Sequence, residues 1–236
     1  MSDPILRVDA RGPRLGASQR TRGVARCEGC ALTLGLCMCA ELPRIEVRTR
    51  VVLVMHHVEL RKTTNTGRLV ARMLSGAEVR VRGERAAEGT PRAPLPPGRR
   101  LLLYPAEGAR VLDRDTLREG ESAVLLVPDG NWTQARRAAR RDVDLRDFEP
   151  VSLPEGESTR YTLRRHPRAG GLSTLEAVAR ALGVLEGPEV EGALLDVFDR
   201  FVARSLAIRA SGKGGQRHEL GPVTPPGASP SSPRND

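Results

Sequence analysis

Residues 49–75 read TRVVLVMHHVELRKTTNTGRLVARMLS, and this stretch contains the pattern that decides the fold. Its first part, residues 49–56, is β-branched and almost continuously apolar, which is typical of a strand buried on both faces of a sheet. Its last part, residues 65–75, places its apolar side chains on one side of a helix. A buried strand followed by an amphipathic helix indicates an α/β unit.

The same alternation continues along the chain. Apolar runs at residues 100–104 (RLLLY) and 123–127 (AVLLV) each end at a proline, and residues 148–153 favour a further strand. Helices are predicted over residues 132–141, 173–185 and 189–210. Short apolar strands separated by helices predict a mostly parallel sheet flanked by helices. Ligands bind such sheets beyond the carboxyl ends of the strands, so we expect the site just after those ends.

The composition and charge of the chain indicate which classes of partner it can bind. Its 236 residues suffice for one substantial domain, and its net charge of +9 favours an anionic partner, with nucleic acid ahead of an acidic membrane surface. A general preference for arginine explains part of the charge, because only Lys62 and Lys213 are lysines. No window reaches the roughly 18 apolar residues of a membrane span, and the N-terminus lacks the apolar core of a secretory signal. We therefore expect a cytoplasmic protein.

All four cysteines lie close together as C-x2-C-x6-C-x-C, at Cys27, Cys30, Cys37 and Cys39. Four thiolates satisfy a tetrahedral Zn²⁺ ion, and a reducing cytoplasm disfavours disulfides. An iron–sulfur site or labile disulfides are the alternatives. A closed site of four cysteines leaves no open coordination position, so we expect a structural zinc ion.

Five ordered motifs accompany the cysteines: HHVELRKTTNTGRL (56–69), LLYP (102–105), DGNW (129–132), YTLR (161–164) and LSTLEA (172–177). Together, over about residues 26–207, they resemble the DTW-domain family of tRNA-uridine aminocarboxypropyltransferases. The resemblance implies that S-adenosylmethionine donates its 3-amino-3-carboxypropyl group to N3 of a uridine in tRNA, releasing methylthioadenosine. It also implies a fold similar to the knotted SPOUT methyltransferases.

These observations divide the chain into four parts. They are a flexible N-terminus (1–22), a four-cysteine zinc module (23–44), a DTW, SPOUT-like catalytic domain (45–210) and a disordered tail (211–236) rich in Gly, Pro and Ser. One motif departs from the family pattern Asp-x-Thr-Trp, because Asn131 stands where threonine is expected. Asparagine is an equally good helix N-cap, which favours a capping role for this position. If the threonine hydroxyl of the family instead contacts the cofactor or the substrate, Asn131 is expected to alter activity or specificity.

Asp129 is the candidate catalytic residue. It follows a buried strand and begins a turn, so its carboxylate is expected either to accept the uridine N3 proton or to anchor the turn or the sulfonium electrostatically. Trp132 is expected either to pack on adenine or to fill the core. Ser173 and Glu176 have the form of a capping box, and the same helix N-terminus is expected to bind the carboxylate of the methionine moiety. The expected cofactor-binding residues are Leu103, Tyr104, Pro105, Pro128, Gly130, Trp132, Ser173 and Thr174.

Several basic residues are candidates for binding RNA. Arg136, Arg137, Arg140 and Arg141 share one face of a predicted helix with no acid among them, so phosphates would relieve their mutual repulsion. A solvated helix face is the alternative. The expected RNA-binding residues are Arg61, Asn65, Thr66, Arg68, Arg136, Arg137, Arg140, Arg164 and Arg165.

Two rival functions remain at this point. A SPOUT-type RNA methyltransferase would use the same cofactor but release S-adenosylhomocysteine. A zinc-containing RNA-binding module without catalysis would bind tRNA but no cofactor. We expect the chain to be a monomer.

Overall fold

The computed structural model describes residues 6–7, 25–82, 94–130, 147–156, 158–163 and 171–211. The helix expected over residues 132–141, most of the expected flexible N-terminus and nearly all of the expected tail lie outside this range. Expectations for Asn131, Trp132 and the arginines at 136, 137, 140, 141, 164 and 165 lie outside it too.

The described residues form one seven-stranded sheet with the order β1-β3-β2-β6-β4-β7-β5. Six strands are parallel to one another, and β1 pairs antiparallel with β3 at one edge. The strands are β1 (Leu6–Arg7), β2 (Arg50–His56), β3 (Glu78–Arg82), β4 (Arg99–Leu103), β5 (Arg110–Val111), β6 (Ala123–Asp129) and β7 (Glu149–Ser152). The mostly parallel sheet is thus confirmed, as are the four strands predicted from apolar runs. The predictions missed β1, β3 and β5, which are short or carry charged residues.

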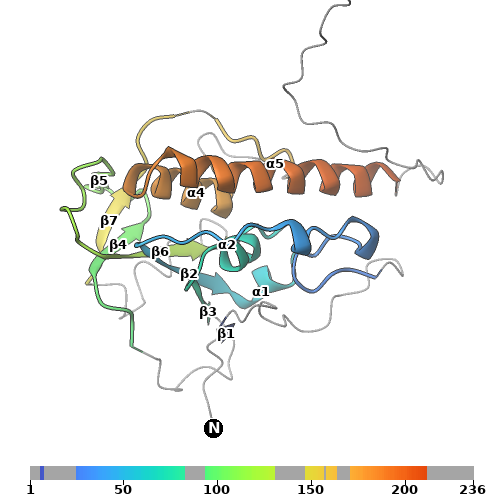
Figure 1. Ribbon diagram of the computed structural model, residues 1–236, viewed down its shortest axis with the longest axis horizontal. Coiled ribbons are helices and arrows are strands. Elements are labelled where there is room, and N and C mark those ends of the chain that lie inside the picture. Colours follow the sequence, from blue (N-terminus) through green and yellow to red (C-terminus); the bar gives the residue numbers. More distant parts are fainter. Residues whose placement is uncertain are drawn as a thin grey trace, which may run out of the picture.

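Four α-helices accompany the sheet in the described part of the chain: α1 (His57–Leu60), α2 (Gly67–Met73), α4 (Thr174–Leu185) and α5 (Pro188–Ser211). Figure 1 shows α4 and α5 side by side along one side of the sheet, and α2 contacts both β2 and α4. Helix α2 begins two residues later than predicted, at Gly67, and the Asn65 side chain just before it accepts a hydrogen bond from the Arg68 amide (3.0 Å). None of these helices has the length and apolar character needed to cross a membrane.

The core lies on both faces of the sheet. Along β2, Val51, Leu53 and Met55 face the main core, which the apolar sides of α2, α4 and α5 complete. Val52 and Val54 face the opposite side, where a smaller cluster includes Leu126 and Phe148. Burial of both faces explains why the central strands are almost continuously apolar.

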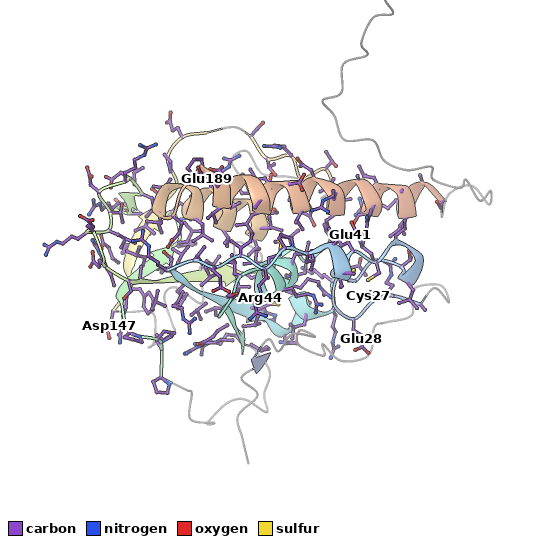
Figure 2. The ribbon with its side chains drawn as sticks, in the orientation of Figure 1. Cys27, Glu28, Glu41, Arg44, Asp147 and Glu189 are labelled. Carbon is purple, nitrogen blue, oxygen red and sulfur yellow. The ribbon has the colours of Figure 1, made fainter. Side chains whose placement is uncertain are left out.

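The cysteine-containing segment shares the main core. Cys30, Leu32 and Met38 are buried in the same cluster as the sheet and helices. Arg204 of α5 donates to the Cys37 carbonyl (3.2 Å) and forms a salt bridge with Glu41 (2.8 Å). Figure 2 shows Cys27 and Glu41 together beneath α5, at the end of the molecule away from Asp147. Residues 25–44 therefore pack directly against the sheet domain.

Candidate functional site

A cavity of about 590 Å³ opens at the carboxyl ends of β4, β6 and β7, where the alternating pattern predicted a ligand site. This volume lies within the range of small-molecule sites, about 300–1,000 Å³. Its walls come from the ends of those strands, the segment after β7 (residues 153–156 and 158–159) and the first turns of α4. The structure brings together these expected cofactor residues in its lining: Leu103, Tyr104, Pro105, Pro128, Gly130, Ser173 and Thr174.

Asp129 lies beside this cavity but is not among the described residues that line it. Its side chain is buried, and one carboxylate oxygen accepts a hydrogen bond from the Thr174 hydroxyl (2.6 Å). The other oxygen accepts from the Asn65 side-chain amide (2.7 Å). Asp129 therefore joins the end of β6 to the starts of α2 and α4, and its role as a general base stays a prediction.

The loop before α2 is bonded inside the protein. The Thr66 hydroxyl accepts from the Leu175 amide (3.2 Å), and Arg68 donates to the Leu60 carbonyl (2.8 Å). Asn65, Thr66 and Arg68 are all buried, whereas Arg61 is exposed. Of the expected RNA-binding residues in this segment, the structure thus presents only Arg61 on the described surface. Asn65 and Thr66 join the loop to β6 and α4, and Arg68 joins α2 to the end of α1.

Two features of this junction were not apparent in the sequence. Burial lowers the pKa of Arg68, and the nearby charges of Cys30 and Asp129 partly offset this effect. Gly67 lies so close to Asp129 that an added Cβ would collide with the carboxylate and come within 3.2 Å of the Met55 methyl carbon. Only tertiary contacts reveal that this position excludes a side chain.

The capping box at α4 is confirmed. The Ser173 hydroxyl accepts from the Glu176 amide (3.3 Å), and the Glu176 carboxylate accepts from the Ser173 amide (2.8 Å). The same carboxylate also accepts from the Thr159 hydroxyl (2.8 Å) and the Arg160 amide (2.8 Å). Glu176 therefore fixes the segment after β7, which forms part of the cavity wall.

These contacts also occupy the N-terminus of α4. The Leu175 amide donates to Thr66, the Glu176 amide donates to Ser173, and the Thr174 hydroxyl donates to Asp129. A ligand carboxylate at this position would have to compete with them. The expectation that this helix end binds the methionine carboxylate stays a prediction.

The four cysteine sulfurs form a second site. They lie within 4.8 Å of one another, and all four cysteines are free of disulfides. Sulfurs of a tetrahedral zinc site lie about 3.8 Å apart, given a zinc–sulfur distance of about 2.3 Å. The Cys27–Cys39 and Cys30–Cys37 distances, 3.5 and 3.9 Å, bracket this value. The cluster could therefore hold a metal ion.

The four thiols influence one another's ionisation. A hydrogen bond from the Cys39 thiol lowers the pKa of Cys30 to about 5, and the same contact raises the pKa of Cys39. Burial raises the pKa of Cys37. Once one thiolate has formed, the neighbouring thiols resist ionisation unless a cation lies among them.

Helix α2 connects the two sites. The Arg72 guanidinium lies close to the cysteines. A Cβ added to Gly29 would lie 2.8 Å from the Cys39 sulfur and 3.0 Å from the Arg72 guanidinium carbon, so both groups flank the same glycine. Five residues earlier, Gly67 contacts Asp129. One short helix thus touches the cysteine cluster at one end and the Asp129 junction at the other.

The sequence model of the DTW domain matches residues 24–206. The tRNA-uridine aminocarboxypropyltransferase 2 of Drosophila melanogaster is 29% identical over 178 residues, covering 72% of this chain and 70% of its own length. The protein of the same name from Macaca fascicularis is 29% identical over 167 residues, covering 68% of this chain and 56% of its own. The tRNA-uridine aminocarboxypropyltransferase A of Arabidopsis thaliana is 26% identical over 210 residues, covering 75% and 79%. No solved structure matches the chain.

Proposed function

The chain belongs to the DTW-domain family, and from this premise we propose that it transfers the 3-amino-3-carboxypropyl group of S-adenosylmethionine to N3 of a uridine in tRNA. The observation that carries the proposal is the cavity at the carboxyl edge of the sheet, because three family motifs meet in its lining. They contribute Tyr104, Gly130 and Thr174. The curated relatives bear the name of this activity.

The cavity fits S-adenosylmethionine in size and chemistry. Apolar side chains at the sheet edge, including Leu103, Val127 and Pro128, suit a nucleoside, and polar groups from α4 and the segment after β7 suit the amino-acid part. When bound, the cofactor supplies a sulfonium-activated γ-carbon, from which methylthioadenosine departs. The residues of the chain orient that carbon and exclude water from it.

Within this proposal, Asp129 is a positioning residue. Its two hydrogen bonds hold Asn65 and Thr174, so that the loop before α2 and the first turn of α4 form one rigid wall. A general base would have to reach the uridine proton, but the Asp129 side chain is buried and each of its oxygens already accepts a hydrogen bond. The geometry therefore favours orientation over proton transfer for this side chain.

Transfer RNA is the proposed partner. The net charge of +9 supplies a basic field for a polyanion, and the exposed Arg61 lies next to the segment that contacts Asp129. The proposal extends to the arginines at 136, 137, 140, 164 and 165, which lie outside the described residues.

We assign zinc to the cysteine cluster and a structural role to the metal. Four sulfur donors at the spacing of a tetrahedral site match zinc chemistry and leave no position for a substrate. A SPOUT-like, knotted arrangement is part of the same proposal. It is supported by family membership and by a parallel sheet whose cofactor-sized cavity lies at the carboxyl edge.

The test is incubation of the purified protein with unmodified tRNA transcripts and S-adenosylmethionine, followed by mass spectrometry of the nucleosides and of the spent cofactor. A uridine heavier by one aminocarboxypropyl group, with methylthioadenosine released, is the expected result. A methylated nucleoside with S-adenosylhomocysteine would instead identify a methyltransferase. Binding of tRNA without any cofactor binding would identify a non-catalytic module.

A further inference from the structure

Arg180 lines the same cavity and is the one positively charged side chain among the described residues of its lining. It lies on α4, on the helix face that also presents Ser173 and Ala177 to the cavity. The rise of an α-helix places it about 9 Å beyond Thr174 along the helix axis. Arg180 therefore lies well away from the crowded N-terminus of this helix.

The guanidinium of Arg180 faces the segment after β7. A Cβ added to Gly156 would lie 3.4 Å from an Arg180 terminal nitrogen. Glu155, the neighbour of Gly156, also lines the cavity and is exposed. This part of the cavity thus carries one basic and one acidic side chain near its open rim.

We propose that Arg180 binds the carboxylate of the aminocarboxypropyl group, with Glu155 facing the ammonium. This inference rests on the proposed function and names the subsite of the transferred group. An α-amino acid carries one carboxylate and one ammonium, and a guanidinium matches a carboxylate with two parallel hydrogen bonds. At the N-terminus of α4, the Glu176 amide donates to Ser173, the Leu175 amide to Thr66 and the Thr174 hydroxyl to Asp129, and Arg180 is the one cation of the described lining.

The position of Arg180 also suits the reaction. A group transferred to a uridine must lie where a large acceptor can reach it, and Glu155, Gly156 and Ser158 at this end of the cavity are all exposed. The neutral adenosine would then pack against the apolar walls formed by the strand ends. The Arg180 end thereby presents the γ-carbon toward the mouth of the site.

Binding of three ligands, measured by titration calorimetry, tests this assignment. They are S-adenosylmethionine, its decarboxylated form, which lacks only the carboxylate, and methylthioadenosine, which lacks the whole transferred group. The native chain is expected to prefer S-adenosylmethionine over the decarboxylated form by about tenfold to hundredfold, as for loss of a charge-assisted hydrogen-bonded pair. Arg180→Ala is expected to abolish this preference while leaving the Kd of methylthioadenosine within about twofold.

Two further variants sharpen the comparison. Arg180→Lys keeps the charge without the paired hydrogen bonds and is expected to restore part of the preference, even if Arg180→Ala folds poorly. Arg118→Ala removes an exposed arginine outside the cavity and is expected to change none of the three affinities. Glu155→Gln is expected to weaken S-adenosylmethionine by only a few fold, since its carboxylate is exposed.

The outcomes separate this inference from the proposed function. Equal weakening of all three ligands by Arg180→Ala, or a preference for the carboxylate that survives in both Arg180 variants, would overturn the assignment while leaving the transferase proposal intact. A native chain that binds none of the three ligands would overturn both.

Discussion

At the scale of single residues, the most constrained contact of the site is between Gly67 and the Asp129 carboxylate. Gly67→Ala is expected to lower the free energy of unfolding by about 1–3 kcal/mol, because the new methyl group overpacks a buried junction. The displaced carboxylate should also weaken binding of S-adenosylmethionine. Chemical denaturation and titration calorimetry measure the two effects. Gly35→Ala is the matched control, since its added Cβ would have no neighbour within 4 Å.

The role of Asp129 is decided by a comparison of Asp129→Asn with Asp129→Ala. An asparagine side chain can still accept from Asn65 and donate to the Thr174 hydroxyl, so a positioning role predicts a kcat within about tenfold of native. Asp129→Ala is expected to lose both contacts and to raise KM for the cofactor. If both variants lost kcat by about 10²–10⁴-fold at unchanged KM, Asp129 would be the general base instead.

At the scale of elements, Glu176 links the cap of α4 to the segment after β7. Glu176→Gln replaces an acceptor oxygen with a donor group where three donors converge, the Ser173 amide, the Thr159 hydroxyl and the Arg160 amide. We expect a loss of about 1–3 kcal/mol, measured as a lower urea midpoint at unchanged m value. Glu189→Gln at the exposed start of α5 should leave the midpoint unchanged. Equal midpoints for the two variants would show that the capping box contributes little.

At the scale of the whole molecule, the cysteine cluster and the sheet share one core, so metal loss should not be a local event. Cys37→Ser, or removal of the metal by a chelator, is expected to lower the Tm of the whole chain by about 10 °C or more. Loss of roughly 4 kcal/mol would suffice, at about 2–4 °C per kcal/mol for a domain of this size. Calorimetry checks the shift, and elemental analysis should find one zinc ion per chain. An unchanged Tm in a chain containing no zinc would contradict the assignment.

Much of the fold followed from the sequence by itself. The segments that form β2 and β6 are apolar at successive positions because both faces of these strands are buried. This pattern can be recognised in the sequence alone. The capping box of α4 and the cysteine spacing are likewise local, since each depends on residues close in the chain. The carboxyl edge of the sheet could be predicted as the ligand site because the alternation of strands and helices already indicated a parallel sheet.

Tertiary structure alone decided which polar side chains face the cavity and which hold its walls. Asn65, Thr66 and Arg68 have the composition of a phosphate-binding loop, yet they are buried and bonded to Asp129, Leu175 and Leu60. Arg180 stands out in no motif and reaches the cavity only because α4 packs beside β6 and the segment after β7. The physical reason is that hydrogen bonding and desolvation depend on neighbours more than 100 residues away, as between Thr66 and Leu175, and such distances leave no periodic signal in a sequence.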